Sequence, residues 1–440
     1  MVVDALPRTN RPICTVNSCS GTCLMQPEPA CRTSRRLASE RIFMALPPEG
    51  SKGFLVILGF AFAVEGALYS AVTPILPLLS RQFDMSDTQA GIMLSSYSAG
   101  LIAGSLLCVL VLRRINARNA AISALTLLAL SSLAFAWAES YDTALTTRLV
   151  QGIAGGATWT ACISWLLRLW PNEKRGEALG LAMGPAVVGT VAGPAIGTVA
   201  VESGVGIPYT VVAVLCGGAA AWLLRMPRPS IKTDATRAVT AAKRKAPAMF
   251  WALVATVSGA LIGLVNLAGP MILVGIGAAE RTAGIVFVIA AIATVIASRF
   301  LGRMVDRKGA ARTAAFGLLV MSVALPPFGA GSGIYVTGAL VVVLILANNL
   351  CYISAGTLLT HEGERAGWSL SFVTALTATV WGIGETAGAL LAGIGLDRLG
   401  ALWTTAGGGV IAASIFAAVA VAAVLIGRTV QPSQKSSIDH

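Results

Sequence analysis

The sequence predicts an all-α polytopic membrane protein with about 12 transmembrane helices in two pseudo-symmetric six-helix bundles. The first observation behind this prediction is composition: 55% of the 440 residues are hydrophobic and only 12% are charged, about half the charged fraction of a soluble domain. The second is the recurrence of apolar runs long enough to cross a bilayer, which takes about 20 helical residues. The third is that no run alternates like a membrane β-strand, and an open sheet cannot span lipid.

Six apolar runs precede a polar stretch near the middle of the chain. Each is long enough to cross the membrane as a helix. Glycine is frequent within them, as expected where helices approach one another closely in lipid. We expect these spans at 53–79, 88–112, 119–138, 142–167, 176–200 and 206–225.

Six further runs follow the polar stretch. The ninth and tenth spans are the hardest to separate, because only a short loop around Gly329–Gly333 divides them. We expect these spans at 248–274, 281–301, 313–329, 333–359, 367–393 and 402–427.

The spans define the expected domain organisation. It consists of a disordered cytoplasmic N-terminal tail (1–52), an N-terminal six-helix bundle (53–225), a basic cytoplasmic linker (226–247), a C-terminal six-helix bundle (248–427) and a cytoplasmic C-terminal tail (428–440).

Metal and nucleotide chemistry are not expected. Four cysteines of the N-terminal tail have the spacing C-x4-C-x3-C-x7-C, which matches no zinc pattern of paired CxxC motifs. Histidine occurs only twice, and no Walker loop is present. The sequence therefore predicts no metal site, no cofactor and no direct coupling to ATP.

Basic residues indicate the orientation in the membrane. Of the 32 Lys and Arg residues, 28 fall on the side of the N-terminus and three on the other side, while Arg148 lies within a span. Because cytoplasmic segments carry the excess of Lys and Arg, we expect a multi-pass protein of the inner or plasma membrane with both termini in the cytoplasm. The net charge of +12 then faces anionic lipid and requires no nucleic-acid partner.

The two halves carry traces of an internal repeat. Displaced by about 195 residues, RRINAR at 113–118 falls on RKGAAR at 307–312. The same displacement brings a pair of glycines in the fifth span onto a pair in the eleventh, namely Gly189 and Gly193 onto Gly384 and Gly388. These matches fit a duplicated six-helix unit.

Three segments carry motifs of a known family. GRMVDRKGAAR at 302–312 follows the eighth span, RLVQGIAGG at 148–156 lies in the fourth, and GLAMGPAVVGTVAGP at 180–194 lies in the fifth. The first two resemble the signature loop and the Arg-x-x-x-Gly motif of the major facilitator superfamily. The third resembles the Gly-Pro motif of its drug:proton antiporter branch.

One departure from the family pattern concerns the loop after the second span. Cys108, Leu112 and Ile115 stand where the intact second-half copy has Gly302, Asp306 and Gly309. The first-half loop therefore lacks the acid that the resemblance associates with gating.

The resemblance implies an architecture and a set of gating residues. Spans one, four, seven and ten should face a cavity between two bundles related by an axis along the membrane normal. The gating residues would be Gly302, Asp306, Arg307, Gly309 and Arg312 after the eighth span, and Gly184, Pro185, Gly189, Gly193 and Pro194 in the fifth.

Physical reasons for these motifs can be given from the residues. Asp306 can join a cytoplasmic charge latch or cap a helix, Gly302 and Gly309 permit tight turns, and proline weakens the helical hydrogen-bond ladder. The alternatives are a basic loop that only sets topology and a fifth span that only packs closely.

Three ionisable residues stand well inside a span, where each costs about 2.5–3.5 kcal/mol: Glu65, Arg148 and Glu385. Burial favours the neutral form of a carboxyl group, which suits reversible protonation. We therefore assign proton coupling to Glu65 with Arg148. The alternatives are a permanent Glu65–Arg148 pair, or an arginine that only bonds backbone carbonyls.

Glu385 follows Trp381 by one helical turn, so an acid and an aromatic surface share one face. Such a face suits a cationic or protonated amphipathic substrate, although the acid could also make only a local hydrogen bond. The other candidate substrate-binding residues are Tyr69, Tyr97, Trp159, Asn266 and Asn348.

These features predict a secondary active transporter, specifically a proton-coupled exporter of hydrophobic or cationic small molecules that works by alternating access. The expected partners are a small-molecule substrate, protons and the lipid bilayer, and the expected state is a monomer. A proton-coupled importer of a small metabolite is the near alternative. A non-transporting membrane sensor or enzyme is the distant one, because the loops are too short to build an active site.

Overall fold

The computed structural model describes residues 51–112, 114–169, 175–226, 246–368 and 370–429. The chain divides into two compact units, Met1–Lys52 and Gly53–His440. Only Ser51 and Lys52 of the first unit are described, so the architecture is that of the second unit. The expected N-terminal tail with its four cysteines, almost all of the linker and most of the C-terminal tail lie outside the described residues.

Helices account for nearly all of the described chain, and no strand occurs within it. They are α2 (Ser51–Gln82), α3 (Asp87–Val111), α4 (Ala117–Ala136), α5 (Tyr141–Leu169), α6 (Arg175–Ser203), α7 (Gly206–Leu223), α8 (Ala246–Gly275), α9 (Glu280–Lys308), α10 (Ala310–Gly329), α11 (Ile334–Arg365) and α12 (Leu370–Thr429).

α12 contains two helices joined at a kink. Gly400, with φ 78° and ψ 171°, is non-helical and separates them. A φ of this sign favours glycine because it has no Cβ atom. The eleven helices of the described chain therefore provide twelve membrane-crossing segments.

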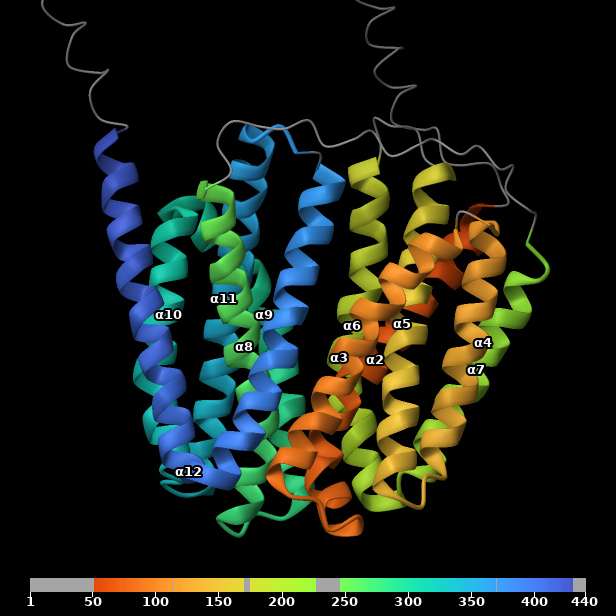
Figure 1. The fold of residues 1–440 in the computed structure, drawn as a ribbon, viewed down its shortest axis with the longest axis horizontal. Helices are drawn as coiled ribbons and strands as arrows, with labels where there is room; N and C mark the ends of the chain where they lie inside the picture. The colour runs from red at the N-terminus through yellow and green to blue at the C-terminus, as the bar shows by residue number, and fades with distance from the viewer. Residues whose placement is uncertain (1–50, 113, 170–174, 227–245, 369, 430–440) are drawn as a thin grey trace, which may run out of the picture. The chain divides into compact units, whose positions relative to one another are not determined.

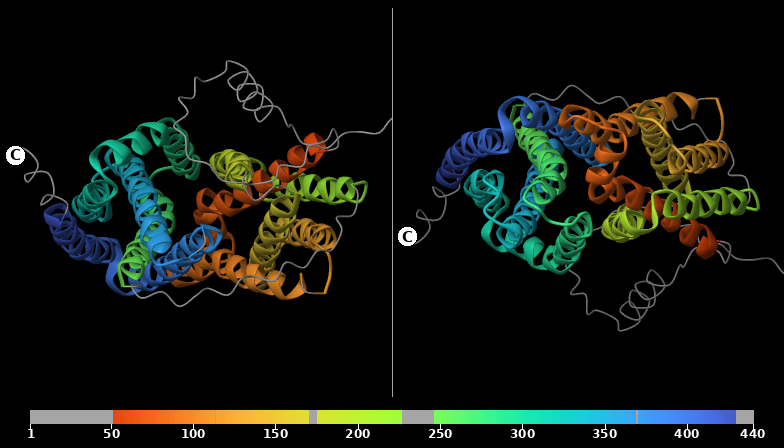
Figure 2. Two further views of the ribbon diagram at one scale, coloured as in Figure 1. Left: turned by 90° about the horizontal axis from the view of Figure 1, so that it is seen from above. Right: turned by 90° about the horizontal axis from the view of Figure 1, so that it is seen from below.

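Two bundles form from consecutive parts of the chain. α2–α7 lie on one side of the molecule and α8–α12 on the other, as Figures 1 and 2 show. The bundles meet where α3 packs against α12 and α6 packs against α9. The predicted all-α architecture of two six-helix bundles is confirmed.

Most predicted spans agree with the helices to within a few residues, but α9 is longer than expected. It continues through the predicted loop to Lys308, and the turn falls at Gly309, where φ is 86°. Gly302 lies inside the helix, so the prediction of a turn at Gly302 is wrong. A glycine occurs both within helices and in turns, so Gly302 alone could not show from the sequence that the helix continues.

Glycines let α6 lie directly on α2, and α12 directly on α8. Cβ atoms built on Gly189 and Gly193 would come within 1.8 and 2.5 Å of α2 carbonyl oxygens. Those built on Gly384 and Gly388 would come within 1.9 and 2.0 Å of α8 carbonyl oxygens. The glycine pairs that the sequence aligned thus make equivalent contacts in the two bundles.

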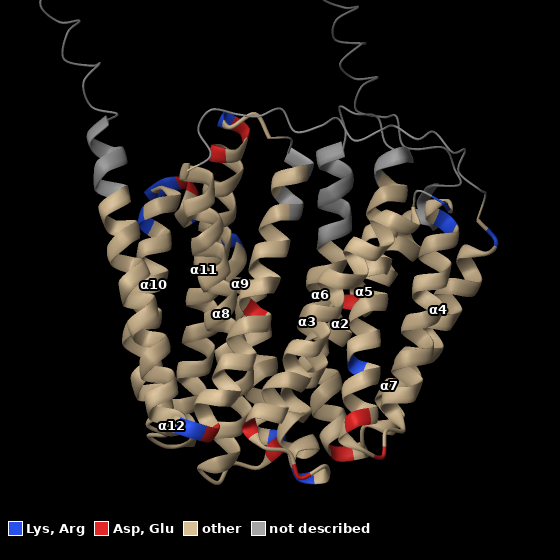
Figure 3. Ribbon diagram, in the orientation of Figure 1, with Lys and Arg blue, Asp and Glu red and all other residues tan. Residues whose placement is uncertain are grey.

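Many large apolar side chains are exposed on the bundles, and most Lys, Arg, Asp and Glu residues lie near the helix ends (Figure 3). Within the described residues, ten helices are long and apolar enough to cross a membrane. α5 is not among them, because Arg148, Gln151 and several threonines lower its hydropathy. Arg148 and Gln151 are fully buried among neighbouring helices.

Candidate functional site

A cavity of about 230 Å³ lies between the two bundles. α2, α3 and α6 line it on one side, and α8, α9, α11 and α12 on the other. The expectation that spans one, seven and ten face a cavity holds for α2, α8 and α11. The same expectation for span four does not, because no residue of α5 lines this cavity.

Six of the candidate substrate-binding residues line the cavity together: Tyr69, Tyr97, Asn266, Asn348, Trp381 and Glu385. Trp159 does not line it. Its ring packs on Phe62 instead, with 4.5 Å between ring centroids. Trp159 is partly buried and packs against the core of the first bundle, and the sequence alone could not distinguish this position from a wall of the cavity.

Glu385 is the acid of the cavity. Its Oε1 atom accepts a hydrogen bond from the Tyr69 hydroxyl, and its Oε2 atom accepts one of 2.9 Å from the Ser98 hydroxyl. The Asn266 amide interacts with the same carboxylate. Tyr69 and Ser98 belong to the first bundle and Glu385 to the second, so these hydrogen bonds connect the bundles at mid-membrane.

Close packing against α8 fixes the backbone around Glu385. A Cβ atom on Gly259 would lie 2.2 Å from the Trp381 carbonyl oxygen, and one on Gly263 would lie 2.4 Å from that of Glu385. α8 therefore supports α12 on both sides of the acid, without room for a larger residue.

The two bundles differ at equivalent positions of this packing. A Cβ atom on Gly66 of α2 would lie 3.1 Å from the Thr190 backbone nitrogen, just as one on Gly259 of α8 would lie 3.0 Å from that of Glu385. Thr190 and Glu385 both line the cavity. The second bundle therefore has a carboxylate where the first has a neutral hydroxyl.

Glu65 is buried but does not line the cavity, and its side chain is 6% exposed. The Tyr97 hydroxyl lies 3.3 Å from its Oε1 atom and donates to it. Gly155 of α5 lies against this pair, since a Cβ atom there would come within 2.9 Å of the Tyr97 hydroxyl and 3.4 Å of the Glu65 side chain. Tyr97, which does line the cavity, therefore stands between the cavity and Glu65.

Arg148 forms no ion pair with a carboxylate of the described chain. It donates to the carbonyl oxygens of Leu68 (2.9 Å) and Tyr69 (3.2 Å) and to the Gln151 side chain (3.1 Å). Its guanidinium carbon lies 4.2 Å from the centre of the Tyr97 ring. The structure therefore does not contain the Glu65–Arg148 ion pair that the sequence left as an alternative. Instead, Arg148 connects α5 with the backbone of α2.

Aromatic rings connect the surroundings of the two acids. The Tyr69 ring lies 6.1 Å from that of Tyr97 and 6.3 Å from that of Trp381, between centroids. Trp381 also meets Tyr352 edge-on at 5.6 Å. Such rings offer faces that attract a cation.

Neutral polar groups complete the cavity wall. Asn348 accepts a hydrogen bond of 2.8 Å from Ser258, and Asn349 donates one of 3.3 Å to Ser298. Both asparagines are thereby held in place rather than free to rotate. Six further hydroxyl-bearing lining residues were not recognised from the sequence, because such residues are common in membrane helices and carry no signal of their own. They are Ser70, Thr73, Ser98, Thr190, Thr294 and Tyr352.

A second group of polar contacts between the bundles lies at one end of the molecule, here called the sealed end. Arg81 of α2 pairs with Glu280 of α9 at 2.5 Å, and Glu202 of α6 pairs with Arg281 of α9 at 2.9 Å. Asp397 of α12 accepts hydrogen bonds from the first two backbone N–H groups of α3, at 3.0 and 2.8 Å. No other ion pair between the bundles occurs among the described residues.

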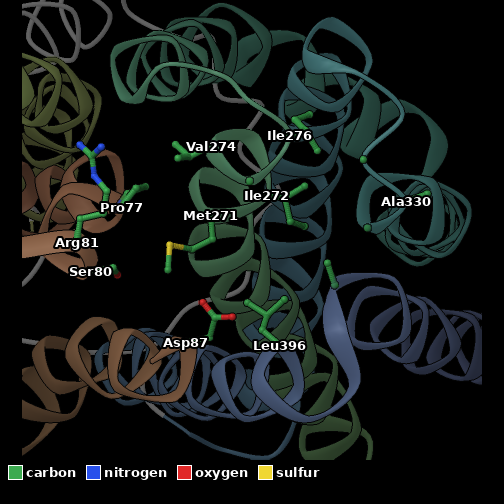
Figure 4. A pocket seen from close by; sticks show the side chains of 14 residues that line it. Pro77, Ser80, Arg81, Asp87, Met271, Ile272, Val274, Ile276, Ala330 and Leu396 are labelled. Carbon is green, nitrogen blue, oxygen red and sulfur yellow. The ribbon is translucent and has the colours of Figure 1, made fainter. Parts of the chain in front are cut away.

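A second cavity, of about 450 Å³, lies at the sealed end. Figure 4 shows Arg81 and Ser80 of α2 facing Met271 and Val274 of α8, with Asp87 near Leu396. It is larger than the first cavity but contains neither intramembrane acid, and its arginine is paired with Glu280. We therefore place the candidate site in the smaller cavity.

The residues assigned to gating divide into two groups. In α6, Gly189 and Gly193 pack on α2 and Pro194 lines the cavity, whereas a Cβ atom on Gly184 would meet nothing within 4 Å. The Pro185 ring lies close to α2, since a Cβ atom built on Gly59 would come within 2.9 Å of it.

Around the α9–α10 turn, the described residues do not form the charge latch that the sequence predicts at Asp306. Asp306 and Arg307 are exposed in the last turns of α9, and Arg312 is near the start of α10. None of the three takes part in an ion pair within the described residues. The cytoplasmic latch at Asp306 thus stays a prediction.

No cluster of His, Cys, Asp or Glu suited to a metal ion occurs in the described part of the chain. Two buried acids, a cavity between two helical bundles and many exposed apolar side chains are the features expected of a membrane transporter.

The chain belongs to the Major Facilitator Superfamily, whose sequence model matches residues 58–367. The chloramphenicol resistance protein of Streptomyces lividans is 23% identical over 363 residues, covering 80% of this chain and 92% of that protein. The synaptic vesicular amine transporter of Mus musculus is 26% identical over 148 residues, covering 33% of this chain and 29% of that protein.

A solved structure of a bacterial homologue of the human lysosomal transporter Spinster superposes with a TM-score of 0.70 at 15% identity. The superposition covers 86% of this chain and 98% of that one, and shows a shared fold. The chain spans 40–48% of the length of the first three curated relatives that it matches.

Proposed function

We propose that the protein is a proton-coupled exporter of hydrophobic or cationic small molecules, working by alternating access with both termini in the cytoplasm. The main support for this proposal is the position of Glu385, a buried acid that lines a cavity with aromatic walls between the two bundles. A carboxylate beside aromatic faces favours a cation. The relatives that resist chloramphenicol or carry amines support this class of substrate.

Glu65 is the proposed proton carrier. It is buried behind Tyr97, outside the cavity lining, so a substrate cannot occupy the same place. Protonation removes a charge that is costly in the membrane interior. In the inward-open and outward-open arrangements of the bundles, the charged and the neutral forms of Glu65 differ in free energy. A proton gradient can therefore bias the equilibrium between the two arrangements.

A proton-coupled importer of a small polar metabolite is the second candidate. Its supporting observation is the row of amides on the second bundle, Asn266, Asn348 and Asn349, which line the same cavity. Amides suit hydroxyl-rich neutral solutes as well as cations.

Flux in proteoliposomes with an imposed pH gradient tests the proposal. Glu65→Gln keeps shape but cannot titrate, so gradient-driven flux should be abolished while substrate binding and exchange persist. Glu385→Gln should change affinity or substrate range. Glu139→Gln, at an exposed acid outside the site, is the matched control and should behave like the wild type.

The outcomes of this experiment distinguish the assignments. Unchanged flux in Glu65→Gln would remove its proton role, and loss of coupling in Glu385→Gln alone would reverse the roles of the two acids. Accumulation of neutral polar solutes down the proton gradient would favour the importer.

A further inference from the structure

The carboxylate of Glu385 is already occupied in this structure. Tyr69 holds one of its oxygens and Ser98 the other, and Asn266 interacts with it as well. The residue is 4% exposed, although it lines the cavity. No Lys or Arg of the described chain forms an ion pair with it. A cation entering the cavity therefore meets a carboxylate covered by hydroxyl donors.

The donors come from the opposite bundle. Tyr69 is on α2 and Ser98 on α3, whereas Glu385 is held on α12 by the packing of Gly259 and Gly263 of α8. Because α8 holds the backbone that carries the acid, we expect the hydroxyls of the opposite bundle to move when another partner approaches. Direct contact between substrate and Glu385 thus requires that a connection between the bundles be broken.

We propose that Tyr69 and Ser98 are place-holders for the substrate cation on Glu385, so that substrate binding replaces hydrogen bonds between the bundles. This inference rests on the proposed function, because it needs Glu385 to receive the substrate. It adds a rule of specificity. A cation gains enough from the carboxylate to displace two hydroxyls, whereas a neutral apolar molecule of the same size leaves them in place and the bundles connected.

This rule predicts that one substitution in the cavity wall increases the affinity for the substrate instead of decreasing it. Removing the Ser98 hydroxyl removes a competitor of the substrate, so Ser98→Ala should bind a cation more tightly than the wild type. Because other donors take over part of the lost hydrogen bond, we expect a decrease of about threefold to tenfold in the dissociation constant. A merely structural role for Ser98 would give weaker binding instead.

The test measures binding of phenyltrimethylammonium, a permanently charged probe, to the purified full-length protein. Ser98→Ala and Tyr69→Phe should each bind it more tightly, and Ser98→Thr, which keeps the hydroxyl, should restore the wild-type affinity. In a Glu385→Gln background Ser98→Ala should have no effect, because no charge is left to compete for. Such a double-mutant cycle isolates the pairwise interaction.

The outcomes separate the two proposals. If the wild type does not bind the probe, or Glu385→Gln binds it equally well, the proposed substrate role of Glu385 fails and this inference fails with it. If Glu385→Gln loses the probe but neither Ser98→Ala nor Tyr69→Phe binds it more tightly, the proposed function stands and the place-holder role is wrong. Tyr69→Phe keeps the ring in the cavity wall, so it decides the matter should Ser98→Ala not fold.

Discussion

Tyr97 and Ser98 are neighbours on α3, yet each donates to a different acid. The Tyr97 hydroxyl reaches Glu65 within the first bundle, and the Ser98 hydroxyl reaches Glu385 across the interface. A movement of this one turn of α3 therefore changes the surroundings of both carboxylates. This gives the substrate and the proton a physical connection, although they occupy different acids.

Tyr97→Phe tests that connection at the proton side. The substitution removes the hydroxyl that Glu65 accepts from, but keeps the ring beneath Arg148. The charged form of Glu65 becomes harder to maintain, and an unsatisfied buried acceptor costs about 1–3 kcal/mol. Gradient-driven flux should fall about tenfold or more, while cation binding without a gradient changes less than about twofold.

Tyr209→Phe is the matched control for this experiment. The Tyr209 hydroxyl is buried, makes no hydrogen bond and lies near Arg148 rather than Glu65, so its loss should change flux and binding less than the loss of the Tyr97 hydroxyl. Equal effects of the two substitutions would show that Tyr97 acts only through packing.

The sequence located the two acids but not their surroundings. Glu65 and Glu385 stood out because charges are rare in membrane spans. Ser98 could not be recognised, because its role depends on an acid 287 positions away in the chain. The partners of Arg148 could not be predicted either, since carbonyl oxygens occur at every residue.

The packing of α8 on α12 is the element that holds the site in shape. Glycines of both helices place each backbone against the other, and the acid lies between those contacts. Small residues at such positions are the usual means by which membrane helices associate. Because the contact is made by backbone atoms, it leaves little room for adjustment.

Gly388→Ala should therefore be costly. Its Cβ atom would lie 2.0 Å from the Ala260 carbonyl oxygen, so α8 and α12 must separate. Overpacking of this kind costs about 1–3 kcal/mol, and we expect a lower thermal midpoint in detergent together with weaker cation binding. Gly382→Ala on the same helix is the control, since its Cβ atom would meet only Ile102 side-chain atoms, at 3.8 Å. Equal stability of the two variants would contradict the assigned role of the packing.

Helices were predictable from the sequence to a greater degree than their ends. Long apolar runs fixed the existence of every span, because only a helix satisfies its backbone in lipid. The end of α9 was misplaced, because Arg303, Asp306 and Arg307 look like a loop but continue the helix into water. The kink at Gly400 was recovered as a gap between two spans.

Across the whole molecule, the sealed end fixes which arrangement of the bundles is observed. The Arg281–Glu202 pair is exposed on both sides, at 67% and 52%, and such pairs contribute only about 0.2–1 kcal/mol. In the Arg81–Glu280 pair the arginine is 70% exposed and the glutamate 9%. The hydrogen bonds to Asp397 contribute more than an exposed ion pair, because Asp397 accepts from two backbone N–H groups that have no partner within α3. Weak, reversible contacts are what the proposed alternating access requires, because this end would have to open during transport.

Asp397→Ala should shift the bundles toward the arrangement that is open at the sealed end. Loss of a helix cap costs about 0.5–2 kcal/mol, which corresponds to a change of several-fold in the population. Spin labels at Gln82 and Ala279, in a background without native cysteines, should report longer distances. Asp142→Ala is the control, because Asp142 lies in the first turn of α5 and has no ion pair among the described residues. An unchanged distance distribution in Asp397→Ala would show that Asp397 does not hold this end closed.

The polarity of α5 has a consequence for biosynthesis. Arg148 and Gln151 lie within α5 and lower its hydropathy, and a central arginine opposes its release from the translocon into lipid. Gln151 of α5 donates a hydrogen bond of 3.2 Å to Ser132 of α4, and both side chains are fully buried. We therefore expect α5 to enter the bilayer paired with α4 as a helical hairpin, so that the arginine reaches the carbonyl groups of α2 without ever facing hydrocarbon alone.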